Sequence, residues 1–385
     1  MSGPVRTLLL LCWRDTGHPQ SGGSETYLQR IGAQLAASGL DVTLRTARYP
    51  GSASEEMVDG VRVSRAGGRY TVYIRAGLAM VAARLGLGPL GRCRPDVVID
   101  SQNGLPFLAR LAFGRKVVVL VHHCHREQWP VAGPLLGRFG WFVESWLSPR
   151  LHRRNQYVTV SWPSARDLAE LGVDSAAIAV VRNGLDKVPP ETLAGRRSLT
   201  PRVVVLSRLV PHKRIEDALD AVAFMRQRVP GVHLDVVGGG WWQQRLIAHA
   251  DRLGIADAVT FHGHISDEAK HAVLQRSWVH VLPSAKEGWG LAVMEAAQHG
   301  VPTIGYRSSG GLTDSVVDGV TGLLVDEREE LVDGLARLLT DHVLREELGA
   351  KAADRSEEFS WTASAAAMRA VCATVHAGER VSGVV

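Results

Sequence analysis

Short runs of Val, Ile and Leu alternate along the chain with longer stretches in which apolar residues recur every three or four positions. The short runs are typical of strands buried on both faces of a parallel sheet, and the longer stretches are typical of amphipathic helices that cover such a sheet. The sequence therefore predicts an α/β fold. The expected strands lie within residues 7–12, 41–47, 96–101, 116–123 and 156–161 of the first half, and within 202–208, 232–238, 258–263, 278–284, 301–306 and 321–325 of the second.

The alternation of strands and helices stops once and then restarts, which predicts two domains, each with its own sheet. The interruption runs from Asn183 to Pro201 and contains Pro and Gly without hydrophobic periodicity, as expected of a linker. We expect two Rossmann-like domains whose parallel sheets face each other across a cleft, the default place for a ligand. The predicted boundaries are 1–188 for the first domain, 189–200 for the linker, 201–358 for the second domain, and 359–385 for a helix and tail that can pack back on the first.

Composition supports a globular protein with two cores, because the chain has 385 residues, of which 45% are hydrophobic and 22% are charged. The apolar run near the amino terminus is interrupted at Trp13, Arg14 and Asp15, so it is interpreted as a first strand and not as a signal peptide. No run is long enough to span a bilayer. The four cysteines lie far apart in the sequence, which favours reduced, buried thiols. Together these features predict a cytoplasmic protein.

Basic residues concentrate in the first half of the chain. Residues 1–190 contain 23 Lys and Arg against 14 Asp and Glu, whereas residues 191–385 contain 21 against 25. Seven arginines and no acid lie between Gly60 and Pro95, which raises nucleic acid or anionic lipid as a partner, with a plain solvated surface as the alternative. Residues 129–154 combine tryptophans with arginines, which suits a membrane interface, with packing against the domain itself as the alternative.

Ligands of open parallel sheets bind beyond the carboxyl ends of the strands, where loops lead into helices. The loop after the first strand contains Gly22 and Gly23, whose backbone can approach a phosphate at the start of a helix, although such turns also occur for structural reasons alone. In the second half, Arg208 and Lys213 follow the end of one strand. Two cations at this place suit a diphosphate, and pairing with surface acids is the alternative.

A second glycine turn follows the expected strand at 232–238. Gly238 and Gly240 invite comparison with dinucleotide-binding proteins, but the pattern G-x-G-x-x-G fails because Gln243 stands at the last glycine position. An NAD-dependent oxidoreductase is therefore disfavoured. We interpret the turn as a place where the backbone approaches a nucleotide closely.

Residues 283–295 are interpreted as a strand end, a glycine-rich loop and the start of a helix. Glu287 lies just before the helix and Glu295 lies within it. A carboxylate can accept hydrogen bonds from two neighbouring hydroxyls of a sugar, and two carboxylates so placed can hold two rings. The amides around Gly288 and Gly290 then face the phosphates between those rings. The alternative is a capped helix with an exposed Glu.

Histidines gather after the expected strand at 116–123, where His122, His123 and His125 surround Cys124. Four adjacent potential ligands suggest zinc, but neighbouring side chains point in opposite directions and no spaced partner ligands follow. No metal site is therefore predicted. We expect instead that one histidine lines the cleft and hydrogen-bonds a sugar, with His122 as the first candidate and His123 as the alternative.

Glu287 and Glu295, with Gly288-Trp289-Gly290-Leu291 between them, resemble the signature of family 4 retaining glycosyltransferases with the GT-B fold. The chain departs from the pattern of that family at His212, where Glu is frequent, and at Thr313-Asp314, where Pro-Glu is frequent. The second departure leaves contacts on the acceptor side open. The resemblance spans nearly the whole chain and also covers Gly22-Gly23, His122, Arg182–Asp186, Arg208, Lys213, Phe261–Gly263, and Gly310-Gly311 through Gly322.

The resemblance implies transfer of a hexose, with retention and without metal or cofactor, from a GDP- or UDP-linked donor to a hydroxyl. It implies that Arg208 and Lys213 neutralise the diphosphate, while Glu287 binds the transferred sugar and Glu295 binds the ribose. The catalytic residues so implied are His122, Arg208, Lys213 and Glu287. The implied nucleotide-sugar-binding residues are Gly22, Gly23, Arg208, Lys213, Gly240, Ile265, Glu287, Gly288, Gly290, Leu291 and Glu295.

Arginine outnumbers lysine 38 to 6, a bias associated with high-GC actinobacteria, in which mannosylation of the cell envelope is common. By analogy, mannose is the favoured hexose, and a glycan or lipid-linked molecule at the inner face of the plasma membrane is the favoured acceptor. The alternatives are a catalytically silent sugar-nucleotide-binding protein, an NAD-dependent oxidoreductase and a nucleic-acid-binding protein. Nucleic acid is not among the partners expected of a transferase.

Overall fold

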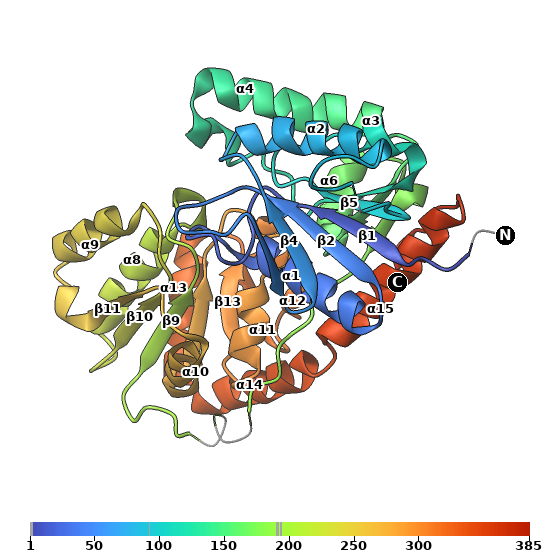
Figure 1. Ribbon diagram of the computed structural model, residues 1–385. Helices are drawn as coiled ribbons and strands as arrows, with labels where there is room; N and C mark the ends of the chain where they lie inside the picture. Colours follow the sequence, from blue (N-terminus) through green and yellow to red (C-terminus); the bar gives the residue numbers. More distant parts are fainter. Residues whose placement is uncertain (1–2, 92, 190–191, 193–194) are drawn as a thin grey trace. The chain divides into compact units, whose positions relative to one another are not determined.

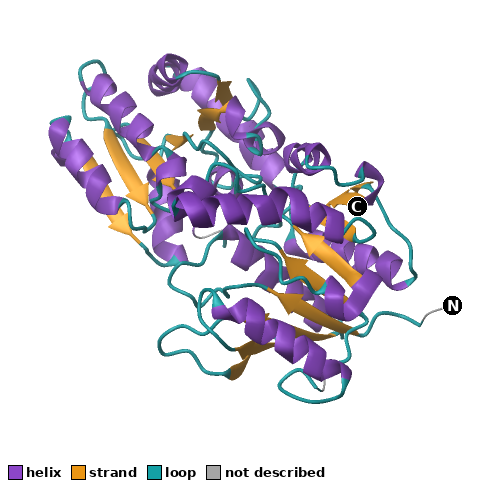
Figure 2. Cartoon of the chain, turned by 90° about the horizontal axis from the view of Figure 1, so that it is seen from above, coloured by secondary structure: helices purple, strands orange, loops and turns teal. Residues whose placement is uncertain are grey.

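The computed structural model describes residues 3–91, 93–189, 192 and 195–385 (Figures 1 and 2). Part of the predicted linker, residues 190–191 and 193–194, lies outside the described residues. The same holds for Arg92, one of the seven arginines between Gly60 and Pro95. The chain divides into two compact units. Unit 1 comprises Met1–Gly184 and Ser360–Val385, and unit 2 comprises Leu185–Phe359.

Unit 1 is built on a nine-stranded sheet with the order β15-β8-β7-β6-β5-β1-β2-β4-β3. Neighbouring strands run parallel, except for the edge hairpin of β3 and β4. The central strands are buried, which explains their continuous apolar runs. The strands are β1 (Thr7–Leu11), β2 (Asp41–Thr46), β3 (Glu55–Val58), β4 (Val61–Arg65), β5 (Val97–Ser101), β6 (Val117–Leu120), β7 (Gln156–Thr159), β8 (Ile178–Val180) and β15 (Gly383–Val384).

Helices cover both faces of this sheet (Figure 1). Leu10 lies against Gly32 of α1 (Gly23–Ala37), and α15 (Trp361–His376) packs on α1. Leu9 and Leu11 belong instead to the core formed with α2 (Thr71–Arg84) and α6 (Trp162–Glu170), and alternate residues of a strand point to opposite faces. The other helical segments are α3 (Arg110–Phe113), α4 (Pro134–Phe142), a π-helical turn (Val143–Leu147), α5 (Ser148–Leu151), and short 3₁₀ turns at Gly114–Lys116, Trp129–Ala132 and Ser175–Ala177.

Unit 2 has a six-stranded parallel sheet with the order β11-β10-β9-β12-β13-β14. Val203 and Val205 face a core with α8, α9 and α13, whereas Val204 faces a smaller core with α10 and α11. The strands are β9 (Arg202–Leu206), β10 (His233–Val237), β11 (Val259–Gly263), β12 (Val279–Leu282), β13 (Thr303–Tyr306) and β14 (Gly322–Val325). The helices are α8 (Ile215–Arg226), α9 (Gln243–Arg252), α10 (Asp267–Arg276), α11 (Leu291–Ala297), α12 (Leu312–Ser315), α13 (Arg328–Thr340) and α14 (His342–Ser356), with 3₁₀ turns at Pro211–Lys213, Ala256–Ala258 and Arg307–Ser309.

The structure contains every strand that the apolar runs predict and adds β3, β4, β8 and β15. These four strands gave no clear signal in the sequence. The β3 and β4 hairpin lies at the edge of the sheet and carries Glu55, Glu56, Arg62 and Arg65, so it lacks an apolar run. The strands β8 and β15 are too short for a pattern, because they span only Ile178–Val180 and Gly383–Val384.

The basic and aromatic segment 129–154 is not one continuous regular helix. It begins with a 3₁₀ turn and continues through α4, a π-helical turn and α5. Within the residues that the structure describes, no helix combines the length and the apolar character needed to cross a bilayer.

In unit 1, the segment at which the chain leaves the unit packs closely against the segment at which it returns. A Cβ atom added at Gly184 would lie 2.2 Å from the amide nitrogen of Trp361, and neither backbone can move aside easily. Gly184→Ala should therefore lower the free energy of unfolding by about 1–3 kcal/mol. Urea denaturation followed by circular dichroism measures the change.

Gly77 provides the matched control, because it lies inside α2 and an added Cβ atom there meets nothing within 4 Å. Alanine favours a helix over glycine, so Gly77→Ala should raise the free energy of unfolding by about 0.5–1 kcal/mol. Equal effects of the two substitutions would contradict this steric explanation.

Candidate functional site

Backbone hydrogen bonds tie together three loops at the carboxyl edge of the sheet of unit 2. The amide of Ser207 donates to the carbonyl of Val237 at 3.0 Å, and the amide of Leu209 donates to the carbonyl of Gly239 at 2.9 Å. On the other side, the amide of Ala285 donates to the carbonyl of His212 at 2.9 Å. We call these loops, residues 207–213, 238–240 and 283–290, the rim.

The glycine turn of the rim has a structural reason of its own. A Cβ atom at Gly238 would lie 2.0 Å from the carbonyl oxygen of Ser207, and one at Gly240 would lie 2.1 Å from that of Leu209. At Gly239, the nearest atom to an added Cβ is 4.0 Å away. Close packing of the turn on the loop after β9 therefore accounts for Gly238 and Gly240 before any ligand is considered.

Lys213 and Glu287 meet on the rim. The Nζ atom of Lys213 lies 2.5 Å from Oε1 of Glu287, and the hydroxyl of Ser284 donates to the same oxygen at 2.7 Å. The side chains of Lys213 and Glu287 are only 13% and 12% exposed. Burial raises the pKa of Glu287, but the charge of Lys213 and the hydrogen bonds from Lys213 and Ser284 outweigh it, so the pKa lies below its usual value. The sequence predicted both residues but not their direct contact.

A loop after β13 clamps the backbone of Glu287. The amide of Glu287 donates to the carbonyl of Ser309 at 2.9 Å, and the amide of Gly311 donates to the carbonyl of Glu287 at 3.2 Å. A Cβ atom at Gly311 would lie 2.5 Å from the carbonyl carbon of Gly288, so only glycine permits this approach. Trp289 is fully buried and packs edge-on against Phe359 at 4.9 Å between ring centroids, which anchors the centre of the loop.

Gly290 is the amino-terminal cap of α11, which carries Leu291 in its first turn and Glu295 one turn later. Glu295 is paired with Lys270 of α10, with Nζ 2.7 Å from Oε1, and Lys270 also contacts Asp267 at 2.7 Å. Burial lowers the pKa of Lys270, but the two carboxylates outweigh it and raise the pKa above its usual value. Lys270 was missed from the sequence, because nothing there shows that α10 and α11 lie side by side.

The remaining predicted residues of unit 2 occupy neighbouring positions. Arg208 is exposed at the start of the rim loop after β9. Ile265 follows β11 and packs against the small core that contains Val204, Val237 and Ala296, the residue after Glu295. The structure therefore brings Lys213 and Glu287 into contact and places Arg208 in the same loop as Lys213. Glu295 pairs with Lys270, a residue that the sequence did not predict.

In unit 1, Gly22 caps α1 and Gly23 is its first residue, at the carboxyl end of β1. The amide of Gly22 donates to Oε2 of Glu25 at 2.8 Å, and Nε of Arg14 donates to Oε1 of Glu25 at 3.0 Å. Arg14 and Glu25 form a buried ion pair that was not foreseen from the sequence. A Cβ atom at Gly23 would meet nothing within 4 Å, so the space beside it is open.

His122 lies two residues beyond β6 and is buried. Its ring packs edge-on against Tyr27 at 5.0 Å between centroids, and its carbonyl accepts a hydrogen bond from the hydroxyl of Ser164 at 3.0 Å. Burial, with a smaller effect of His125, lowers the pKa of His122 to about 3. The imidazole is therefore neutral at physiological pH, and its Nε2 atom has no hydrogen-bond partner within the described residues.

The neighbouring histidines are held by other side chains. His123 is 2.7 Å from the Nε2 atom of Gln128, and Nδ1 of His125 is 3.0 Å from Oε1 of the buried Glu144. Trp129 donates to the other oxygen of Glu144 at 2.6 Å. Across the described ranges, the structure contains no group of three or more His, Cys, Asp or Glu side chains that could hold a metal ion.

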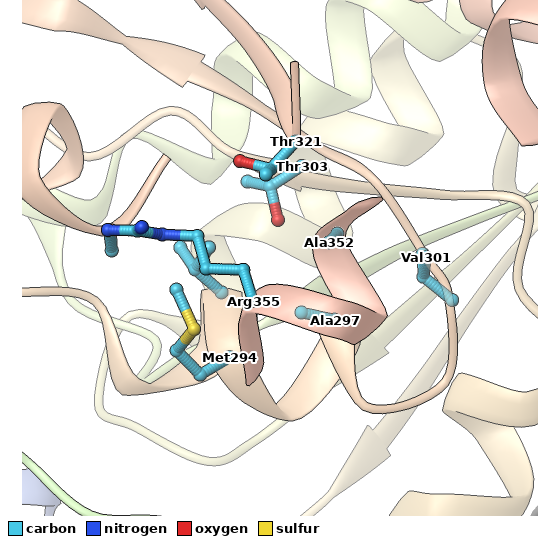
Figure 3. A pocket seen from close by; sticks show the side chains of 9 residues that line it. Met294, Ala297, Val301, Thr303, Thr321, Ala352 and Arg355 are labelled. Atoms are coloured by element: carbon cyan, nitrogen blue, oxygen red, sulfur yellow. The ribbon is translucent and has the colours of Figure 1, made fainter. Parts of the chain in front are cut away.

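A pocket beside α11 lies apart from the predicted residues (Figure 3). Its lining is largely apolar, and Arg355, which reaches it from α14, donates to the carbonyl of Asp314 at 3.0 Å. We interpret it as a gap in the packing of unit 2. It is lined by Val293, Met294, Ala297, Val301, Thr303, Ser315, Thr321, Ala352 and Arg355.

Family models match both units. The model described as Glycosyl transferases group 1 matches residues 195–355, and the model described as Glycosyltransferase Family 4 matches residues 21–188. A glycogen synthase from Mycobacterium tuberculosis is 31% identical over 93% of this chain and 92% of its own length. A GDP-mannose-dependent alpha-(1-6)-phosphatidylinositol monomannoside mannosyltransferase from the same species is 32% identical over 60% of this chain and 63% of its own.

Solved structures share the architecture. Sucrose-phosphate synthase from Thermosynechococcus elongatus has a TM-score of 0.80 at 21% identity and covers 97% of this chain and 100% of its own. Anabaena HepE in complex with UDP and glucose has a TM-score of 0.70 at 18% identity, with 94% and 97% covered. The chain thus has the GT-B fold that the sequence predicts, and its similarity to the glycogen synthase extends over nearly its whole length. The chain belongs to family 4 of the glycosyltransferases.

Proposed function

We propose that the protein transfers a hexose from a nucleotide diphosphate sugar to a hydroxyl, with retention of configuration and without a metal ion. The contact between Lys213 and Glu287 on the rim carries this proposal. It joins a cation suited to a phosphate with a carboxylate suited to sugar hydroxyls, and a sugar diphosphate presents both groups side by side.

The donor is proposed to separate Lys213 from Glu287 and to give each side chain a new partner. In the free protein Lys213 and Glu287 neutralise each other. A bound diphosphate offers Lys213 and Arg208 negative oxygens, and the sugar hydroxyls donate hydrogen bonds to the carboxylate of Glu287. The positive charge of Lys213 and Arg208 then lies where the leaving group becomes negative.

In the proposed reaction the acceptor oxygen forms a bond to the anomeric carbon on the face from which the diphosphate departs. The bond from the anomeric carbon to the phosphate oxygen breaks, and the acceptor proton passes to the departing phosphate. Stabilisation of the leaving group is then the main contribution of the protein, and no side chain is needed as a base.

The remaining predicted residues keep the roles that the family resemblance implies. Glu295 and Ile265 are proposed to contact the ribose and the base. The amides at Gly288 and Gly290, together with Gly22 and Gly23, are proposed to approach the phosphates. The neutral ring of His122 is proposed to hydrogen-bond the sugar, which its unpartnered Nε2 atom supports.

The donor is proposed to be GDP- or UDP-linked, with mannose as the favoured hexose. A GDP-mannose-dependent relative supports a GDP-linked donor, and the complex of HepE with UDP and glucose supports a UDP-linked donor. The proposed acceptor is a glycan or a lipid-linked molecule of the cell envelope, at the inner face of the plasma membrane. The competing proposal is a catalytically silent sugar-nucleotide-binding protein, and turnover distinguishes the two.

The central test is a thermal-shift screen with UDP- and GDP-sugars, followed by product analysis with each sugar that stabilises the protein. We expect one donor class to raise the melting temperature and to yield a product whose anomeric configuration equals that of the donor. Turnover in EDTA should equal turnover in Mg²⁺, since side-chain cations replace the metal. An inverted product or a requirement for metal would refute that part of the proposal, and stabilisation without any product would favour the silent protein.

Arg208→Ala and Lys213→Ala should each lower kcat by roughly a hundredfold or more, because one electrostatic contact to a developing charge contributes about 3–4 kcal/mol to lowering the barrier. Steady-state kinetics with the identified donor measures the loss. Arg252→Ala and Lys351→Ala are the controls, since both side chains are exposed on helices of unit 2 away from the rim. Normal turnover in both rim variants would contradict the proposal that Arg208 and Lys213 bind the diphosphate.

Glu295→Gln should raise KM for the donor by roughly tenfold to a hundredfold with little change in kcat. A hydrogen bond to a charged group contributes about 1.5–3 kcal/mol, and contacts to the ribose are equal in ground and transition states. Glu347→Gln, exposed on α14, is the control. A loss in kcat at constant KM would instead place Glu295 beside the reacting atoms.

A further inference from the structure

The helix α2 has apolar side chains on two faces. Its buried face, with Val72, Ala76, Ala79, Met80 and Ala83, belongs to the core of unit 1. The opposite face carries a second apolar row at a helical spacing of four, four, three and four residues. The members of this row are Tyr70, Ile74, Leu78, Val81 and Leu85, which are 58–75% exposed, and the first and last of them are the caps of the helix.

The segment around α4 repeats this arrangement. An exposed apolar row with the same spacing begins in the 3₁₀ turn before α4 and ends in the π-helical turn after it, and it consists of Val131, Leu135, Phe139, Phe142 and Trp146. Phe142 stacks on Trp146 at 5.0 Å between centroids. Because a surface helix normally has one apolar face directed to the core, a second such row indicates a partner.

Both rows lie on the same side of the sheet of unit 1. The connections from β4 through α2 to β5, and from β6 through α4 to β7, advance in the same direction along the sheet. Right-handed crossovers then place both helices on one face, as Figure 1 shows. Of the 23 exposed large hydrophobic side chains in the described residues, 13 lie between positions 66 and 154. We call this face the α2–α4 surface.

The α2–α4 surface is bordered by positive charge. Arg69, Arg75 and Arg84 flank the first row, and Arg138 and Arg150 flank the second. Arg150 stacks on the ring of Trp146 at 4.4 Å, with its charge beside the aromatic face. Among the described residues from 66 to 154, Glu127 is the only acidic side chain that is exposed.

We propose that the α2–α4 surface docks unit 1 on an anionic lipid bilayer, with the two apolar rows at the boundary of the acyl chains and the arginines at the phosphate groups. A bilayer accepts both features at once. Nucleic acid offers no apolar partner to Leu and Ile. A second copy of the chain would bring the same arginines face to face. The proposal deepens the proposed function, because docking would bring unit 1 to the bilayer that holds a lipid-linked acceptor. Only this link to the acceptor rests on the proposed function.

Co-sedimentation of the full chain with unilamellar vesicles tests the proposal without any turnover. The protein should bind vesicles of phosphatidylcholine and phosphatidylglycerol at low salt, and bind vesicles of pure phosphatidylcholine much less. Added salt should weaken binding but not abolish it, because the apolar contribution is not screened.

Leu78→Glu and Arg75→Glu should each weaken binding to anionic vesicles by roughly tenfold or more. Both side chains are exposed, so neither substitution disturbs the core. Val343→Glu on α14 and Arg369→Glu on α15 are the controls, since they make the same chemical changes at exposed helical positions outside the α2–α4 surface. They should leave vesicle binding within about twofold.

Several outcomes would overturn the proposal. These are absence of binding to anionic vesicles, equal losses in the controls, binding of RNA but not of vesicles, or a dimer in sedimentation velocity that Leu78→Glu dissociates. Failure of the transferase proposal would give a different experimental result. In that case vesicle binding and its dependence on Leu78 and Arg75 persist, while no sugar nucleotide is turned over.

Discussion

A cation and a carboxylate from neighbouring loops neutralise each other at the carboxyl edge of the sheet of unit 2, and the candidate site depends on this pair. Lys213 and Glu287 are 74 residues apart in sequence but follow β9 and β12, which are adjacent strands. Both charges are largely withdrawn from water, so leaving either one alone is costly. Under the proposed function, the donor replaces both partners at once, because it supplies a negative group to Lys213 and hydroxyl donors to Glu287. Free phosphate or free sugar would replace only one of them.

Most of the fold could be predicted from the sequence because parallel strands buried on both faces must be continuously apolar. The predicted ends of the strands also gave the positions of Arg208, Glu287 and His122, because the loops that follow parallel strands lie at one edge of the sheet. What the sequence could not supply were side-chain contacts between separate elements. Lys270 meets Glu295, and Arg14 meets Glu25, only because two elements are adjacent in space. The glycines at 238 and 240 were expected for their approach to a ligand, and backbone packing within the rim explains them as well.

The two units differ in how they handle charge. In unit 2, three side chains of the predicted site, Lys213, Glu287 and Glu295, are each paired with an opposite charge, in the pairs of Lys213 with Glu287 and of Lys270 with Glu295. On the α2–α4 surface of unit 1, by contrast, arginines border exposed apolar rows with almost no acid nearby. The first arrangement suits a small ligand that replaces internal partners. The second suits an extended surface that supplies both hydrocarbon and negative charge.

Unit 1 is assembled from two separated stretches of the chain, whereas unit 2 is continuous. The strand β15 extends the sheet at β8, and α15 lies on α1. The side-chain amide of Gln156 donates to the carbonyl of Val381 and accepts from the backbone amide of the same residue. During synthesis, Leu185–Phe359 leaves the ribosome with all of its strands present and can fold at once. The earlier stretch must wait, with one edge of its sheet and the apolar underside of α1 uncovered, until residues 360–385 arrive. Folding of the amino-terminal half is thereby coupled to the synthesis of a segment that follows the whole of unit 2.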